Sequence, residues 1–227
     1  MSIWRLFALV CIFFVMSITF YCYFYYGDCI FFGRFLWQPK QTGSIMPTSR
    51  IAATELIQPM LAKDGPRNIL EVGAGTGPVT EVVAEHLRPE DKFDVLELDD
   101  VLCDLLRDKF SAYEQLDIHC VPIEQWDPGY QYDVIISTVP LTNLNSEQIQ
   151  PILHQFEQLA KSNGVISYLE YIGGMQLKQL VATEEQKIEM QKKEQLFDTF
   201  KNKHKTDTVS VLVNVPPTYV HHVNMLK

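Results

Sequence analysis

The chain has 227 residues, 47% of them hydrophobic and 21% charged, and its formal net charge is -9 at pH 7. This length allows one globular domain of ordinary size beside a short terminal segment. The negative net charge argues against nucleic-acid binding through overall electrostatic attraction, because that attraction comes from clustered Lys and Arg. The five cysteines form no C-x-x-C pair and no metal-ligand spacing with His, which favours free thiols and predicts no metal site.

The amino-terminal segment carries no charge from residue 6 to residue 26 and is rich in Phe, Val, Leu, Ile and Tyr. This length is close to the ~20 residues that span hydrocarbon, so we expect one transmembrane helix within residues 1–28. A cleaved signal peptide is the alternative, but no small-residue cleavage motif follows the apolar run. Arg34, Lys40 and Arg50 come after the span, and their positive charge favours a single-pass membrane protein whose globular domain is cytoplasmic.

Residues 29–48 connect this segment to the predicted domain, residues 49–227. The first half of the connection combines aromatic residues with Arg34 and Lys40, a composition typical of a membrane interface. Apolar residues at helical spacing then predict a helix from about Ser49 to Leu61.

The rest of the chain alternates apolar runs with amphipathic segments, which predicts strands and helices in turn. The expected strands lie within 67–77, 92–100, 117–122, 132–140 and 164–172, and the expected helices lie near 79–87, 101–110, 146–160 and 176–204. Such alternation indicates an α/β fold with a mostly parallel sheet covered by helices on both faces. Two final apolar segments, 209–215 and 218–223, are joined by two prolines and predict an antiparallel C-terminal hairpin, which makes seven strands.

A glycine-rich loop follows the first predicted strand. Gly73, Gly75 and Gly77 form G-x-G-x-G, where glycine supplies backbone angles closed to other residues and lets a ligand approach the backbone. Pro78 stands where a dinucleotide fingerprint has its last glycine, so that fingerprint fails. The alternative is a turn whose glycines serve packing alone.

Two acids sharpen the interpretation of this loop. Glu71 lies two residues before Gly73, where its carboxylate can meet a ligand ammonium group. Glu97 ends the second predicted strand, where an acid binds ribose hydroxyls in related nucleotide sites. Ammonium plus ribose fits S-adenosylmethionine better than NAD. Asp99 is the alternative ribose acid if the strand ends two residues later; otherwise it belongs to a solvated loop.

These motifs, "ILEVGAGTG" with Glu97 and the later "STVPL" turn, resemble the class I S-adenosylmethionine-dependent methyltransferases. Three segments, "TGSIMPTSR", "STVPLTNL" and "VNVPPTYVHHV", more narrowly resemble the bacterial phospholipid N-methyltransferases, which are related to the rRNA adenine dimethylases. The resemblance covers about residues 32–223. It implies a Rossmann-like fold, a methyltransferase that modifies the amine of a membrane phospholipid, and no nucleic acid partner or metal.

The resemblance also implies a set of site residues. Residues 43–49 would form a flap over the cofactor side of the sheet. At the end of the third strand this chain has Pro122 and Ile123 where the family has an acid, so either Glu124 or Ile123 alone would hold the adenine. The cofactor-binding residues implied are Glu71, Gly73, Gly75, Thr76, Gly77, Glu97, Ile123 and Glu124.

Candidate acceptor residues follow the fourth and fifth strands. Pro140 and Leu141 lie in the turn that, in the resembling families, lines the pocket beside the transferred methyl. Thr138 and Leu141 replace the Asn and the aromatic residue of the rRNA dimethylases, which counts against an adenine substrate. Near the end of the fifth strand Tyr168, Glu170 and Tyr171 reach the rim, and Tyr171 is a candidate for cation–π contact with the amine. Core packing of these three is the alternative.

Two other functions remain open. One is methylation of RNA or protein by a membrane-tethered enzyme of the same fold, which the acidic charge disfavours in the case of RNA. The other is a membrane scaffold with a retired methyltransferase fold, which the intact glycines and acids disfavour. The long charged helix is typical of a solvated helix with ion pairs, although its lysine-rich end would also suit anionic headgroups.

Overall fold

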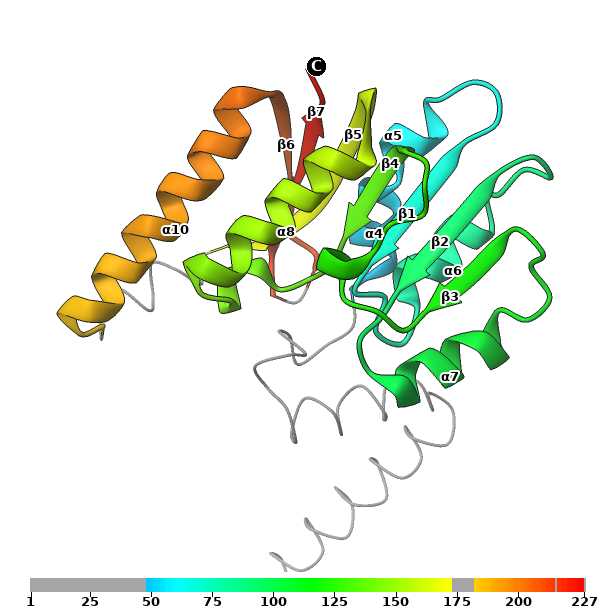
Figure 1. Cartoon of the computed structure of the whole chain (residues 1–227), viewed down its shortest axis with the longest axis horizontal. Helices are drawn as coiled ribbons and strands as arrows, with labels where there is room; N and C mark the ends of the chain where they lie inside the picture. The colour runs from blue at the N-terminus through cyan, green and yellow to red at the C-terminus, as the bar shows by residue number, and fades with distance from the viewer. Residues whose placement is uncertain (1–47, 173–181, 215, 227) are drawn as a thin grey trace, which may run out of the picture. The chain divides into compact units, whose positions relative to one another are not determined.

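The computed structural model describes residues 48–172, 182–214 and 216–226. A seven-stranded sheet forms its centre, with the strand order β3-β2-β1-β4-β5-β7-β6 (Figure 1). The five strands from β3 to β5 run parallel, whereas β7 runs antiparallel to both β5 and β6. The mostly parallel sheet and the C-terminal antiparallel pair are therefore confirmed.

Helices and strands alternate along the chain as expected. The strands are β1 Asn68–Val72, β2 Lys92–Leu96, β3 Leu116–His119, β4 Tyr132–Ser137, β5 Ala160–Tyr171, β6 Lys205–Val211 and β7 Thr218–Asn224. The helices are α4 Arg50–Leu56, α5 Gln58–Leu61, α6 Pro78–Ala84, α7 Asp100–Lys109, α8 Ser146–Leu159 and α10 Glu184–Lys203, with 3-10 turns η1 Ile123–Gln125 and η2 Leu141–Asn143.

Several boundaries differ from the sequence prediction. The helix expected from 49 to 61 is divided at Ile57, because Pro59 has no amide hydrogen to continue the helical bonding. α10 begins at Glu184, where Thr183 forms a capping box with Gln186; the expected residues 176–181 lie outside the described chain. β6 ends at Val211, so that residues 212–214 form a turn instead of continuing the strand.

Each face of the sheet has its own hydrophobic core, because successive strand residues point to opposite faces. One core packs Ile69 and Val134 against α4, α5, α6 and α7. The other packs Leu70 and Ile135 against α8 and α10. Fully burying each such side chain contributes about 1.5–3 kcal/mol, so the strands that carry the functional loops are held from both sides.

The carboxyl ends of β1, β2, β4 and β5 meet at one edge of the sheet, which we call the carboxyl edge. The chain goes from β1 to β2 on one side, while β4 pairs with β1 on the other side. Open α/β sheets bind ligands at such a switch point. The glycine loop leaves β1 at this point.

The predicted transmembrane segment lies outside the described residues. Within the described part of the chain, no helix combines the length and the apolar character that a membrane crossing requires. Cys103 and Cys120 form a disulfide, so the expectation of free thiols is wrong for these two cysteines.

Candidate active site

The glycine loop adopts the left-handed backbone that its sequence predicted. The φ angles of Gly73, Gly75 and Gly77 are 81°, 60° and 85°. A Cβ atom on Gly73 would lie 3.0 Å from Val139 Cγ2, so the loop passes close to the turn after β4. Glycine is thus needed here both for backbone angles and for close approach.

Gly77 has an additional packing role. A Cβ atom there would lie 2.8 Å from both Leu106 and Phe110, which form part of the core under α7. Close packing within the protein, one of the two alternatives that the sequence offered, therefore applies to both Gly73 and Gly77.

Gly77→Ala is expected to lower the free energy of unfolding by about 2–4 kcal/mol, since the left-handed conformation and the overpacked core both cost free energy. Gly129→Ala is a matched control, because Gly129 has φ 75° and no atom within 4 Å of the added Cβ. Urea denaturation measures both variants. Equal losses would show that packing against Leu106 and Phe110 adds nothing to the requirement for glycine.

Thr138 fixes the loop from the neighbouring strand. Its hydroxyl donates to the Gly73 carbonyl at 2.6 Å, and its amide donates to the Val72 carbonyl at 3.1 Å. The sequence indicated only that Thr138 replaces the Asn of related enzymes. The available signal that Thr138 would hold the glycine loop was its position directly after β4.

Glu71 lies within β1 with no exposed surface. Neither of its carboxyl oxygens makes a hydrogen bond of full geometry within the described chain, although the hydroxyl and amide of Thr80 lie close enough to lower its pKa. Burial raises the pKa of Glu71 to about 8, and the nearby charge of Glu97 acts in the same direction. A buried carboxyl group without a hydrogen bond of full geometry, next to a glycine loop, suits a cationic ligand group.

Glu97 follows β2 and reaches across to the glycine loop. Its carboxylate accepts hydrogen bonds from the amides of Gly75 and Leu98, both at 2.7 Å, and of Asp99 at 3.1 Å. Asp99 instead caps α7, accepting from the Val101 amide at 3.0 Å. The structure thus places Glu97, and not the alternative Asp99, against the loop.

The residues after β3 are divided between core and surface. Ile123 is 4% exposed and packs in the core below α8, whereas Glu124 on the same 3-10 turn is exposed. Leu98 is 67% exposed beside Glu97 and was missed by the sequence reasoning. The available signal in the sequence was the position of Leu98, an apolar residue directly after the predicted ribose acid.

The turn after β4 lies beside the loop, as Val139 shows through its approach to Gly73. Pro140 precedes η2 and is partly exposed. Leu141 is 2% exposed and belongs to the core on the α8 side. Of these two predicted acceptor residues, Pro140 therefore presents more surface at the carboxyl edge.

The three residues near the end of β5 do not share one environment. Tyr168 is buried, with its ring centroid 6.2 Å from that of Phe197 and 4.8 Å from that of His221, so core packing was the correct alternative for it. Glu170 accepts from His221 Nε2 at 2.9 Å and from Lys201 Nζ at 3.4 Å. The His221 hydrogen bond, helped by the Lys201 charge, holds the pKa of Glu170 below its usual range. Tyr171 is partly exposed.

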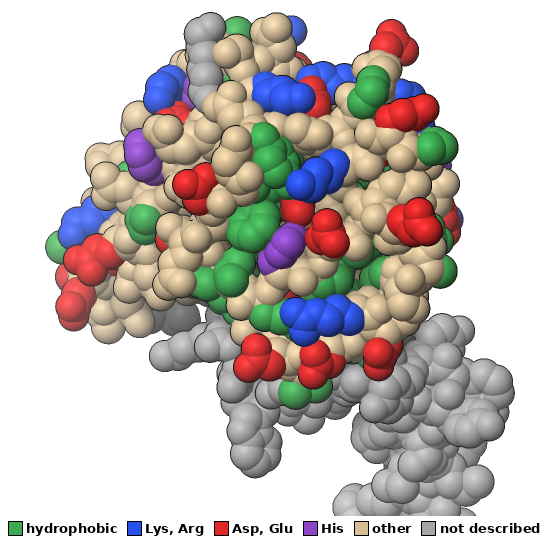
Figure 2. Space-filling model, turned by 45° about the vertical axis from the view of Figure 1, so that its right-hand side comes forward, with side chains coloured by type: hydrophobic (Ala, Val, Ile, Leu, Met, Phe, Trp, Pro, Cys, Tyr) green, Lys and Arg blue, Asp and Glu red, His purple; other side chains and the backbone are tan. Residues whose placement is uncertain are grey.

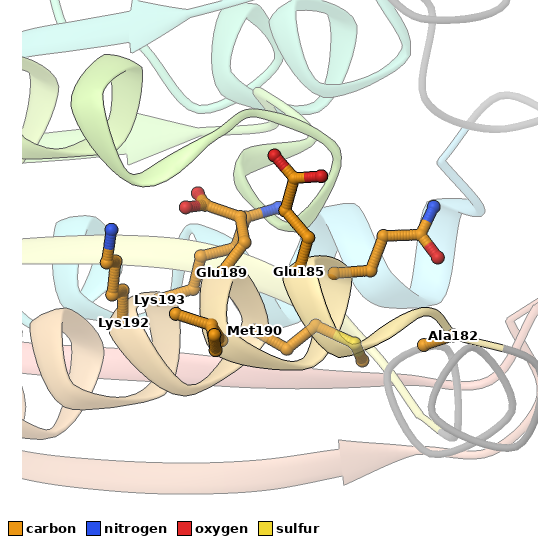
Figure 3. A pocket seen from close by; sticks show the side chains of 8 residues that line it. Ala182, Glu185, Glu189, Met190, Lys192 and Lys193 are labelled. Carbon is orange, nitrogen blue, oxygen red and sulfur yellow. The ribbon is translucent and has the colours of Figure 1, made fainter.

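A pocket of 560 Å³ lies along the first half of α10 (Figure 3). Lys193 donates to the Thr142 carbonyl at 3.3 Å, and Glu189 accepts from Ser146, so the pocket adjoins the connection between β4 and α8. Glu185 and Glu189 extend to the same side of the helix in this view. The described lining residues are Ala182, Glu185, Gln186, Ile188, Glu189, Met190, Lys192 and Lys193, none of which was a predicted site residue.

Metal ligands are not gathered in this region. In residues 48–172, 182–214 and 216–226, no group of three or more His, Cys, Asp or Glu side chains could hold a metal ion.

Comparison with known proteins gives one family match and several relatives. The family model described as a methyltransferase domain matches residues 70–166, from β1 to β5. Ornithine lipid N-methyltransferase of Singulisphaera acidiphila is 25% identical to this chain over 146 residues, which cover 62% of this chain and 76% of that relative.

Solved structures show the same fold. N-methyltransferase NodS from Bradyrhizobium japonicum WM9, in complex with S-adenosyl-l-homocysteine, matches with a TM-score of 0.60 and 13% identity over 78% of this chain and 87% of that chain. The CurJ carbon methyltransferase matches with a TM-score of 0.59 and 19% identity over 78% of this chain, which spans only 54% of that chain. The family match therefore shows a methyltransferase domain in residues 70–166, with S-adenosylmethionine as methyl donor, and the strand order agrees with the fold of these solved structures.

Proposed function

We propose that this protein methylates the amine of a phospholipid headgroup of the phosphatidylethanolamine type. We further propose that it is attached to the membrane by one span within residues 1–28, with the catalytic domain on the cytoplasmic side. The similarity to an ornithine lipid N-methyltransferase carries the choice of a lipid amine. The uncharged run from residue 6 to residue 26 supports the attachment.

The site residues fit the methyl donor. The buried Glu71 carboxyl, without a hydrogen bond of full geometry from the described chain, would hold the ammonium group of the cofactor. Glu97 would bind the ribose hydroxyls of the cofactor. Thr76 and the three glycines would line the cofactor site. The adenine would be flanked by Ile123, Glu124 and Leu98. When bound, S-adenosylmethionine supplies a methyl group activated by a positively charged sulfur. Pro140 and Tyr171 lie on the acceptor side, where their role is to position the amine.

The acceptor amine must be unprotonated to react, and Glu170 is a poor candidate for the base. This carboxylate is engaged by His221 and Lys201, and its lowered pKa makes it a weak proton acceptor. Positioning of the neutral amine at the carboxyl edge is therefore the contribution expected from the protein, with water receiving the proton.

Lipid profiling tests this function. The full chain is expressed in a host without methylated aminolipids, and its membranes are supplied with labelled S-adenosylmethionine. Labelled aminolipid is expected with the unaltered chain and not with Glu97→Ala. If label enters RNA or protein while the aminolipids stay unlabelled, the lipid substrate is wrong. If calorimetric titration detects no cofactor binding by the purified chain, the alternative of a scaffold protein without methyltransferase activity is favoured.

A further inference from the structure

Exposed apolar side chains gather at the carboxyl edge of the sheet. Nine large hydrophobic residues are exposed in the described part of the chain. Leu98 and Val101 follow the end of β2, and Ile188 lies near the start of α10 beside the β4–α8 connection. The six members at this edge are Ile51, Leu98, Val101, Ile188, Leu212 and Val213.

The turn between β6 and β7 carries the most exposed pair. Leu212 is 70% exposed and Val213 is 64% exposed, directly after β6 ends at Val211. Asn214, at 3% exposure, is the anchor of this turn. Its side chain accepts from the Ser49 amide at 3.0 Å and donates to the Pro216 carbonyl at 2.8 Å. The turn is therefore fixed from beneath while two adjacent apolar side chains point into solvent.

We propose that Leu212 and Val213, together with Ile51, insert into the apolar layer of a lipid bilayer and set the carboxyl edge against the membrane. We call these three residues the apolar rim. This inference rests on the proposed function and names the surface through which the enzyme would meet its substrate.

Two features identify a bilayer as the partner of the apolar rim. The rim lies at the same sheet edge as the glycine loop, so insertion would bring lipid headgroups to the methyl donor. The described chain also begins beside the rim, because Ser49 is bonded to Asn214 and follows the segment that contains the apolar run 6–26. The apolar run that we propose to enter the membrane therefore precedes, in the chain, a residue that is bonded to the turn of the rim.

Charge indicates that insertion depends on apolar contact instead of attraction to anionic lipid. The formal net charge of the chain is -9, and Figure 2 shows acidic and basic side chains interspersed over one face of the molecule. Lys203, at the lysine-rich end of α10, pairs with Glu157, and Lys205 begins β6 at the end away from the rim. The alternative contact through this lysine-rich end would not face the carboxyl edge.

Tryptophan quenching tests the insertion in the full chain. Leu212→Trp is reconstituted into phosphatidylcholine vesicles that contain brominated lipid, and its emission is compared with that of the unaltered chain. We expect the added emission to shift to shorter wavelength and to be quenched by the brominated chains. Leu226→Trp is the matched control, because Leu226 is 63% exposed beyond the other end of β7. Its added emission should stay unquenched.

Other occupants of the rim give different results, and each would overturn the proposal. A shift of the Leu212→Trp emission without quenching would mean that protein, either this chain or a second copy, covers the rim. Equal quenching of the Leu212→Trp and Leu226→Trp emission would show that the carboxyl edge does not face the bilayer in preference to the opposite edge. Quenching that requires anionic lipid and disappears at high salt would replace apolar insertion by electrostatic binding.

A kinetic measurement separates docking from catalysis. Leu212→Asp with Val213→Asp is expected to raise the KM for vesicle-borne aminolipid at least about tenfold, because each buried apolar side chain contributes about 1.5–3 kcal/mol. Activity on a short-chain, water-soluble aminolipid should not change, and Leu226→Asp should behave as the unaltered chain. An unchanged KM on vesicles would contradict the proposal. If neither substrate is methylated, the proposed function fails, while the quenching result still decides the docking.

Discussion

Replacing Glu97 by Ala is expected to weaken S-adenosylmethionine binding by at least about 100-fold. Two hydrogen bonds from ribose hydroxyls to a carboxylate contribute about 1.5 kcal/mol or more each, and their sum corresponds to this factor. The substitution also removes the acceptor that holds the Gly75 and Leu98 amides, so the glycine loop loses a fixed position. Isothermal titration calorimetry measures the change directly.

Asp99→Asn is the matched control for this prediction. Asn can replace Asp as the cap of α7, so the variant removes the charge of the alternative acid without removing the cap. Its affinity for the cofactor should stay close to that of the unaltered chain. The opposite result, with Asp99→Asn impaired and Glu97→Ala unaffected, would show that the ribose acid is Asp99.

Glu71→Gln is expected to abolish a large pH dependence of stability in the ligand-free chain. The pKa of Glu71 is raised from 4.5 to about 8 by burial, so between these values the folded chain binds a proton that the unfolded chain releases. Stability contributed by the protonated carboxyl is therefore lost as pH rises through this window, at about 1.4 kcal/mol per pH unit. Urea denaturation between pH 5 and pH 8 should show the variant gaining stability relative to the unaltered chain at that rate.

Cofactor binding should depend on pH in the opposite direction. An ammonium group pairs with the ionised carboxyl, so the apparent affinity of the unaltered chain should rise by up to about tenfold per pH unit towards pH 8. The Glu71→Gln variant should bind weakly with little pH dependence. Glu81→Gln, on the exposed side of α6 where Glu81 pairs with Lys109, is the control. Parallel affinity curves for Glu71→Gln and the unaltered chain would exclude Glu71 as the ammonium partner.

The sequence alone determined the alternation of strands and helices, because apolar periodicity and glycine punctuation are local signals. It also predicted that Gly73, Gly75, Gly77 and Glu97 lie at one sheet edge, since a strand, a tight turn and the next strand bring them there whatever surrounds them. The element boundaries do not follow from local signals alone: the end of β6 depends on its pairing with β7, which is not visible in the apolar run 209–215.

Contacts between distant segments were decided by the tertiary structure. Thr138 bonds to Gly73 across 65 residues, Glu170 is bound by His221 across 51 residues, and Tyr168 is buried by α10. The protonation of Glu71 follows from complete burial, which depends on both neighbouring strands. Likewise Leu212 and Val213 look like strand residues in the sequence. Only the fold shows that β6 ends before them and leaves their side chains exposed at the edge that carries the cofactor loop.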